Sequence, residues 1–170
     1  MKLRELQLKD APLMLEWMHD EDVVHNLRAD FMSKTIDDCI DFINFSNSET
    51  NLHMAIVSGD DEYMGTVSLK NIDKVKKEAE LGITVRKKAM SKGYSWFGMN
   101  NILEIAFKKL DLCKVYWCVS KNNLRAIGFY NKHNFNEMNN ISDNILERYK
   151  DIKNLKWYVV NKAEWINLYK

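Results

Sequence analysis

A short polar segment, Ser91-Lys92-Gly93-Tyr94-Ser95, lies between an apolar strand and a long amphipathic helix. In this position, small and basic residues turn their backbone amides outward at the first turn of the helix. Those amides and the positive end of the helix dipole favour a phosphate group. The segment therefore predicts the binding site of a phosphorylated cofactor.

Other kinds of reactive site are not favoured by the residue pattern. The loop lacks a Lys-Ser or Lys-Thr pair at the spacing of a nucleotide-hydrolysing phosphate loop. Neither Ser91 nor Ser95 lies in a nucleophile elbow, which disfavours covalent catalysis. The three cysteines and four histidines show no metal-ligand spacing, so no metal is expected.

Length and composition indicate an ordinary folded protein. With 170 residues, of which 46% are hydrophobic, the chain can bury a core, and a single domain over residues 1–170 is expected. No segment resembles a signal peptide or a bilayer span, so we expect a cytoplasmic location and no membrane partner. The lysines are scattered among acidic residues without a known recognition pattern, which disfavours a nucleic-acid partner.

The charges are unevenly distributed along the chain. Residues 1–60 carry 5 basic and 12 acidic side chains, a net charge of −7, whereas residues 61–170 carry 20 and 12, a net charge of +8. One interpretation is two ligands of opposite charge, an amine at the first part and a phosphorylated cofactor at the second. The other is a solvated surface, which is the usual meaning of a charge run.

Periodicity predicts the elements that position the loop. Alternating apolar residues predict strands over 3–8, 52–57, 63–69, 79–85 and 115–119, with two further strands at 135–138 and 157–160. Helices are predicted from Ala11, where Pro12 marks a helix start, and after Thr35, where Asp38 completes a capping box. Further helical patterns cover 99–110, 124–132 and 163–169. A strand, a crossover helix and a second strand imply parallel neighbours at 79–85 and 115–119.

The order of these elements over essentially the whole chain resembles the GNAT superfamily of acetyl-coenzyme A dependent N-acetyltransferases. The most specific match is NLRAIGFYNKHNF, from Asn123 to Phe135, which is similar to the family segment N-x-x-A-I-x-x-Y-x-K-x-G-F. Asn134 replaces the glycine, and asparagine is the other residue that tolerates a left-handed helix end. Segments 15–23, 149–151 and 157–165 also match, most closely the RimJ/RimL and spermidine acetyltransferase branch.

This resemblance implies an α/β (α+β) fold, with a mixed central sheet of about six or seven strands and about four or five helices. It also implies acetyl-CoA as acetyl donor. The family loop is roughly Q/R-x-x-G-x-G/A, so Met90 stands where Gln or Arg is expected and Ser95 where a small residue is expected. Nearby cations Arg86, Lys87, Lys88 and Lys92 are expected to attract the phosphates. The residues implied against the cofactor are Ile83, Thr84, Val85, Ser91, Lys92, Gly93, Tyr94, Ser95, Asn123 and Arg125.

The resemblance also assigns two catalytic roles. Glu80 is the candidate base that takes a proton from the acceptor amine through a water, with Glu78 as the second candidate. Alternatively, Glu80 is a polar residue on the outward side of a half-covered strand. Tyr130 is the candidate acid that protonates the leaving sulfur, and its alternative role is packing four residues from Ala126 on a buried helix face.

The acceptor is implied to lie against the first helices and their connector, at Trp17, His19, Asp22 and Phe31. The acidic residues there favour a cationic amine: a polyamine, a peptide N-terminus or an amino sugar. Met90 and Asn134 leave open a second hypothesis, a domain that binds CoA or a protein without catalysis. A homodimer is possible, because Trp157 and Trp165 either contact a second copy or close the chain's own sheet.

Overall fold

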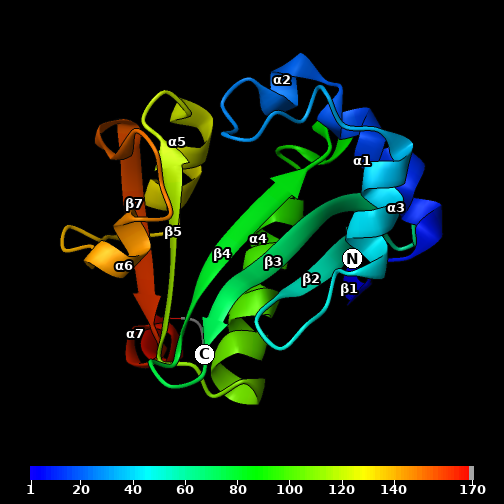
Figure 1. The fold of residues 1–170 in the computed structure, drawn as a ribbon. Coiled ribbons are helices and arrows are strands. Elements are labelled where there is room, and N and C mark those ends of the chain that lie inside the picture. The colour runs from blue at the N-terminus through cyan, green and yellow to red at the C-terminus, as the bar shows by residue number, and fades with distance from the viewer. Residues whose placement is uncertain (169–170) are drawn as a thin grey trace.

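The computed structural model describes residues 1–168, and these residues build a seven-stranded sheet in the order β1-β2-β3-β4-β5-β7-β6 (Figure 1). All neighbouring strands are antiparallel except β4 and β5, which run parallel as predicted. The strands are β1 (Lys2–Glu5), β2 (Leu52–Val57), β3 (Tyr63–Asp73), β4 (Glu78–Val85), β5 (Lys114–Ser120), β6 (Asn136–Glu137) and β7 (Leu155–Asn161).

Seven α-helical segments surround this sheet within the described residues, compared with the four or five expected. The surplus consists of α2 and α6, which are single turns of four residues. The segments are α1 (Ala11–Met18), α2 (Glu21–Val24), α3 (Ile36–Asn44), α4 (Tyr94–Glu104), α5 (Leu124–Lys132), α6 (Asp143–Leu146) and α7 (Lys162–Leu168). A π-helical turn, Ile105–Lys109, extends α4. The predicted end of the last helix at Tyr169 lies outside the described residues.

Local signals set the helix starts. Thr35 and Asp38 form the predicted capping box, in which the Asp38 carboxylate accepts from the Thr35 amide at 2.8 Å and the Thr35 hydroxyl accepts from the Asp38 amide at 3.3 Å. Helix α1 begins at Ala11 as predicted. Asp10, immediately before it, makes no side-chain cap, because its buried carboxylate accepts two hydrogen bonds from Arg4, at 2.7 and 2.8 Å.

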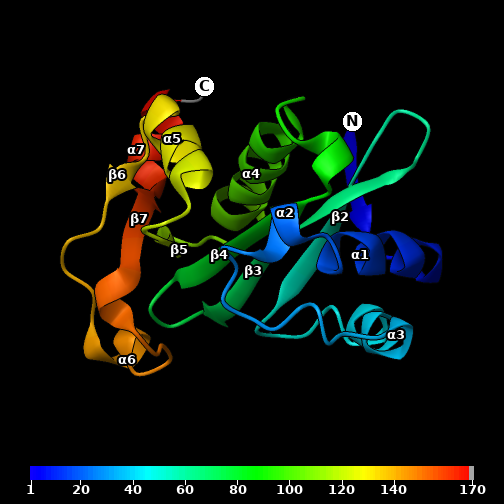
Figure 2. The ribbon, with the colours of Figure 1, turned by 90° about the horizontal axis from the view of Figure 1, so that it is seen from above.

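The helices cover both faces of the sheet (Figure 2). One core lies between the sheet and α4, where Ile102 and Leu103 pack with Val67. A second core lies under α1 and α3, where Met14 and Cys39 pack with Ala55 and Val57 of β2. Alternate residues of β2 supply the two cores, as the period of two in a strand requires, since Ile56 packs in the first core.

The feature that positions the site is the separation of β4 from β5. The two strands pair only over three residues, from Glu78 opposite Lys114 to Glu80 opposite Tyr116. Beyond this point residues 81–85 of β4 stay paired with β3, and residues 117–120 of β5 stay paired with β7. The strands therefore spread apart into a V, open toward α2 and α5 (Figure 1).

The C-terminal tryptophans are part of the chain's own core. Trp157 is 4% exposed and contacts the ring of Tyr149, and Trp165 is 6% exposed and lies 5.6 Å from the ring of Phe107. Of the two roles considered for these tryptophans, the structure shows packing within the chain's own fold. Within residues 1–168, no helix is both long enough and apolar enough to span a bilayer.

Candidate active site

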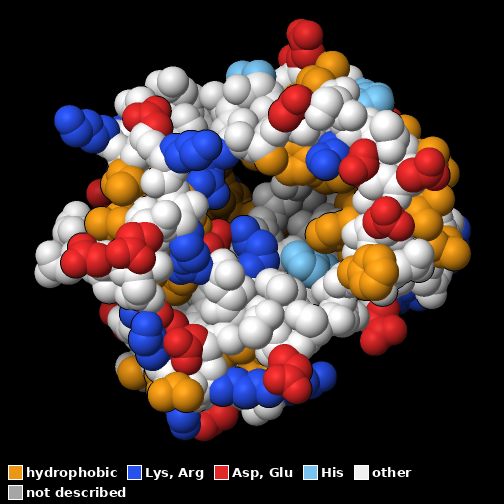
Figure 3. Space-filling view, in the orientation of Figure 1, with side chains coloured by type: hydrophobic (Ala, Val, Ile, Leu, Met, Phe, Trp, Pro, Cys, Tyr) orange, Lys and Arg blue, Asp and Glu red, His pale blue; other side chains and the backbone are white. Residues whose placement is uncertain are grey.

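Three cavities follow one another along β4, and Figure 3 shows the hollow that they form. The loop cavity, about 410 Å³, lies between the 90–95 loop, the end of β4 and α5. The gap cavity, about 270 Å³, lies in the V between β4 and β5. The helix cavity, about 310 Å³, lies against α1 and α3. Ile83 and Thr84 line all three, so the cavities meet at these two residues.

The loop cavity contains most of the predicted cofactor residues. Ser91 and Gly93 have positive φ angles of 60° and 84°, which turn the chain sharply into α4. The amides of the first turn of a helix have no intrahelical acceptor and so remain available to an anion. Lys92, Gly93 and Tyr94 do not line this cavity. Seven of the ten predicted residues do: Ile83, Thr84, Val85, Ser91, Ser95, Asn123 and Arg125.

Three of the four cations expected to attract phosphate are occupied elsewhere, which corrects that expectation. The buried Arg86 guanidinium is held by Glu16 at 2.7 Å and Glu62 at 2.8 Å. Lys87 pairs with Asp22, and Lys88 with Glu62. Within residues 1–168, Lys92 alone of the four has no carboxylate partner.

A different cation stands at the loop cavity. Arg125 at the start of α5 donates to the sulfur of Met90 at 2.8 Å. Met90 therefore holds a guanidinium beside the loop, at the position where the family pattern has Gln or Arg. Lys132 lines the same cavity from the end of α5. The charge that Met90 does not carry is thus supplied by α5.

The backbone of β4 offers polar groups to the gap. The Arg86 amide donates to the Met64 carbonyl of β3 at 2.9 Å. Since successive amides of a strand point to opposite edges, those of Ile83 and Val85 point away from β3, toward the opening between β4 and β5. These residues fit acetyl-CoA, because the loop amides suit phosphates and the free strand edge suits the amide-containing arm of the cofactor.

Glu80 lies at the closed end of the V, 5% exposed, and lines the gap cavity. Its carboxylate accepts from Lys70 at 2.8 Å and from Asn71 at 3.2 Å, and Arg148 stands 3.6 Å away. Burial raises the pKa of Glu80, but Lys70, Tyr149 and Arg148 outweigh this effect, so the pKa lies below its ordinary value. Glu80 is therefore ionised at neutral pH.

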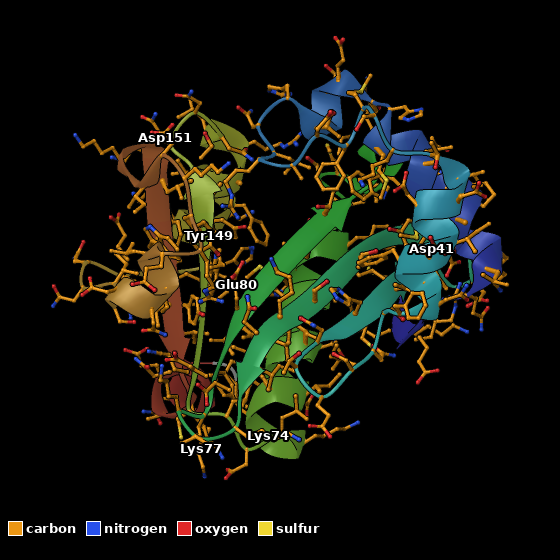
Figure 4. All side chains as sticks on the ribbon, in the orientation of Figure 1. Asp41, Lys74, Lys77, Glu80, Tyr149 and Asp151 are labelled. Atoms are coloured by element: carbon orange, nitrogen blue, oxygen red, sulfur yellow. The ribbon has the colours of Figure 1, made fainter. Side chains whose placement is uncertain are left out.

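Tyr149 joins this cluster from the segment between α6 and β7 (Figure 4). Burial and a hydrogen bond with Glu80 raise the pKa of Tyr149 well above its ordinary value. The Arg28 guanidinium lies over the face of the Tyr149 ring, 4.3 Å from its centre. Sequence reasoning quoted Tyr149 only as part of a family match, and it missed Lys70, Arg148 and Arg28, because none of them has a local motif.

Tyr130 has the packing role considered for it, and it also lies where the predicted acid is required. Its ring is buried and packs near Trp117 and Tyr158, with ring centres 5.4 and 4.9 Å away. It also lines both the loop cavity and the gap cavity. Burial raises the pKa of Tyr130 well above its ordinary value, so the phenol keeps its proton at neutral pH. A protonated phenol can donate to a leaving sulfur.

Helix α5, which presents Tyr130, is capped at both ends. The buried Asn123 side chain accepts from the Ala126 amide at 3.1 Å, which confirms the predicted N-cap. Asn134 has the predicted left-handed conformation, with φ of 56°. The Phe135 amide donates to the Tyr130 carbonyl and the Asn134 amide to the Asn131 carbonyl, which completes a Schellman motif.

The predicted acceptor residues do not all meet. Trp17 and Phe31 line the helix cavity, with ring centres 5.0 Å apart. His19 instead contacts the Lys34 carbonyl at 2.8 Å, and Asp22 pairs with Lys87 at 2.5 Å, so neither lines any of the three cavities.

The helix cavity also contains a histidine that sequence reasoning set aside. His53 Nδ1 lies 2.7 Å from the Ser68 hydroxyl, and both side chains are buried. Burial and the charge of Lys70 lower the pKa of His53 to about 4. The ring is therefore neutral at physiological pH and adds no charge to the cavity.

Glu78, the second candidate base, lies away from the cavities and pairs with Lys114 at 2.5 Å. Glu78 lies on the same face of β4 as Glu80 but two residues further from the opening of the V. Within the described part of the chain, no group of three or more His, Cys, Asp or Glu side chains is arranged to hold a metal ion.

Comparison with known proteins places this geometry in a family. The acetyltransferase (GNAT) domain model matches residues 1–136. The uncharacterized N-acetyltransferase p20 of Bacillus licheniformis is 25% identical over 137 residues, 78% of this chain and 77% of that protein.

Solved structures show the same fold. Spermidine N-acetyltransferase from Vibrio cholerae, in complex with CoA and spermine, has a TM-score of 0.80 at 17% identity over 98% of both chains. Another structure of the spermidine/spermine N-acetyltransferase SpeG from that organism gives 0.72 at 17% identity over 99% of this chain and 96% of that one. The chain therefore belongs to the GNAT acetyltransferase family, and the predicted mixed α/β fold, acyltransferase class and acetyl-CoA donor are confirmed.

Proposed function

We propose that the chain transfers an acetyl group from acetyl-CoA directly to a primary amine in the gap cavity, with Glu80 as base and Tyr130 as acid. The observation that supports this proposal is the V between β4 and β5. Its closed end holds Glu80, its walls include Tyr130, and its outer end opens into the loop cavity. Glu80 on β4 and Tyr130 on α5 therefore face the same cavity.

The amine must lose a proton before it can attack. Glu80 is ionised and held by Lys70 and Asn71, so it accepts that proton through a water rather than by direct contact. Acetyl-CoA supplies the acetyl group as a thioester. One nitrogen–carbon bond forms and the carbon–sulfur bond breaks, with no covalent bond to the protein.

Two further groups stabilise the negative charges that develop on the carbonyl oxygen and on the leaving sulfur. The amide of Ile83 or Val85 points toward the opening and is placed to donate to the carbonyl oxygen on which negative charge develops. Tyr130 gives a proton to the leaving sulfur, because its phenol stays protonated in its buried setting.

Release of free thiol from acetyl-CoA in the presence of a panel of amines tests the activity. We expect Tyr130→Phe to lower kcat about 10-fold to 100-fold while leaving acetyl-CoA affinity nearly unchanged. Tyr158→Phe is the matched control, because Tyr158 is also a buried tyrosine of the same cluster but lines none of the three cavities. An unaltered rate in Tyr130→Phe would remove Tyr130 from the mechanism.

The alternative of binding without catalysis has a separate outcome in this assay. A rise in melting temperature with acetyl-CoA, but no thiol release with any amine, would favour it. The single-domain organisation, cytoplasmic location, homodimer and RimJ/RimL-like branch stay predictions. The structural relative that contains CoA and spermine supports an amine as acceptor, and this chain's own residues decide which kind of amine.

A further inference from the structure

The charged residues of the gap and helix cavities differ from those that a polyamine site requires. Three cations line the two cavities, Arg28, Lys34 and Lys70, against two anions, Asp38 and Glu80. A polyamine carries several positive charges and needs carboxylates that are free to receive them. The walls of these cavities are instead slightly positive.

Both carboxylates of the cavity walls already have partners. Asp38 pairs with Lys34 at 3.2 Å and accepts from the Thr35 amide in the capping box of α3. Glu80 is held by Lys70 at 2.8 Å, with Arg148 at 3.6 Å. Binding a second ammonium ion at either carboxylate would require an existing ion pair to open.

Arg28 is the cation of the cavity walls that lacks a carboxylate partner. Within residues 1–168, no carboxylate oxygen lies within 4.0 Å of its guanidinium, which instead lies over the Tyr149 ring, 4.3 Å from the ring centre. Stacking on a ring leaves the edge of the guanidinium, with its N–H donors, free to bind. That planar edge matches a carboxylate or a phosphate.

Tyr149 connects this cation to the proposed base. Its ring carries Arg28 on one face, and its hydroxyl lies near enough to Glu80 to lower the pKa of that carboxylate, so Arg28 and Glu80 both neighbour one phenol. An anion bound by Arg28 would therefore lie close to an amine that loses its proton at Glu80. One small molecule that carries both groups could occupy the two positions together.

We propose that the acceptor is a small primary amine that also carries a carboxylate or a phosphate, which Arg28 binds at the wall of the gap cavity. This inference rests on the proposed acetyl transfer. It makes Arg28 a residue that determines specificity, and it excludes polyamines as the preferred acceptors. Free amino acids and phosphorylated amines are the two sources of this chemistry.

Three four-carbon amines separate the possibilities: putrescine, with a second cation; 4-aminobutanol, which is neutral at that end; and 4-aminobutyrate, with a carboxylate. Ethanolamine with phosphoethanolamine, and glycinamide with glycine, extend the comparison to phosphate and to amino acids. We expect kcat/KM to be at least 10-fold higher for the anionic member of a set than for its neutral partner. A higher value for putrescine or the neutral amines would overturn the inference and leave the acetyltransferase activity intact.

The variant Arg28→Gln tests the residue itself. It should lower kcat/KM for the best anionic amine about 10-fold to 100-fold, the range for a lost hydrogen bond to a charged group, and by a much smaller factor for the neutral partner. Lys74→Gln is the control, since it removes one positive charge from an exposed turn at the far end of the sheet (Figure 4). Equal losses for both amines would show that Arg28 does not read the anion.

A binding measurement keeps the two proposals separable. If no amine releases thiol, the proposed function fails, and calorimetry with 4-aminobutyrate and with 4-aminobutanol in the presence of CoA still tests the inference. Tighter binding of the anionic amine, weakened by Arg28→Gln, would support the anion site. Equal binding of the two would refute it.

Discussion

Replacing Glu80 by glutamine tests the centre of the proposed site through two independent quantities. The variant keeps the size of the side chain and removes the charge that Lys70 and Arg148 share. If Glu80 is the base, kcat/KM should fall about 100-fold, the lower end of the range for general-base catalysis, because the proton passes through a water. The assay is thiol release over pH 6 to 9 with a saturating concentration of acetyl-CoA.

The same change should lower stability by a limited amount. Removing one member of a fully buried ion pair costs about 3 to 5 kcal/mol. Here the side chains of Lys70 and Arg148 are 36% and 31% exposed, so water screens the charges left behind. We therefore expect a loss of about 1 to 2 kcal/mol, which lowers the melting temperature by roughly 2 to 8 °C for a chain of this size.

The pH dependence gives the sign of the effect. The pKa of Glu80 in the folded protein lies below its ordinary value of 4.5. Its contribution to stability is then fully present above about pH 4.5 and is lost as the pH falls through the lower folded pKa. The difference in stability between the wild-type protein and Glu80→Gln should therefore shrink below pH 4. In the rate profile, Glu80 stays ionised from pH 6 to 9, so the acidic limb reflects the amine.

The matched control is Glu78→Gln, which removes a second buried glutamate of β4. Glu78 pairs with Lys114 at 2.5 Å and lines none of the cavities, so its loss should lower stability and leave kcat/KM unchanged. A folded Glu80→Gln protein with a rate within 3-fold of wild type would refute the role of Glu80. Equal rate losses in both variants would attribute the effect to damage to β4.

Three further predictions concern other parts of the structure. Lys92→Gln should weaken acetyl-CoA binding at low salt about 2-fold to 5-fold, whereas Lys88→Gln should not, because Glu62 already neutralises Lys88; titration at two salt concentrations compares them. Asn134→Ala should cost about 1 kcal/mol in urea unfolding and Asn134→Gly about none, since φ is 56° there. His53 should titrate near pH 4 by NMR. Because its pKa in the unfolded chain is near 6.5, the free energy of unfolding should fall by roughly 2 to 4 kcal/mol as the pH falls from 6.5 to 4. His53→Gln should lack this dependence.

Elements with a strong local signal were predictable from the sequence. The capping box at Thr35 and the strand 52–57 need only neighbours in sequence, and the structure places helix α3 and strand β2 at those positions. Asn134 was predictable for the same reason, because a left-handed helix end accepts few residue types. Element ends were less certain, and β3 runs to Asp73, four residues past its predicted end at Leu69.

The site was predictable where its residues lie in motifs. Asn123 and Tyr130 were found through one helix, and Ile83 and Ser91 through the strand and the loop beside it. Lys70 lies opposite Glu80 in the register of β3 with β4, which only the folded hairpin fixes. Arg28 and Arg148 come from distant parts of the chain and approach Tyr149 and Glu80 only in the folded protein, so no spacing rule connects them.

Charge gave the least reliable prediction, because a count of residues does not show which charges are neutralised. The acidic first third predicted an acidic acceptor site, yet Glu16 and Asp22 are paired with Arg86 and Lys87 of the basic part. These two pairs join the acidic and the basic part of the chain across the fold, so the charges of Glu16 and Asp22 are neutralised in space. A ligand meets only the charges that ion pairs do not neutralise. At the wall of the gap cavity, within residues 1–168, Arg28 is the cation without a carboxylate partner. In our proposal, a guanidinium that has no carboxylate partner within residues 1–168, beside a fully paired carboxylate, selects an acceptor by its anion, although the bond is made at its amine.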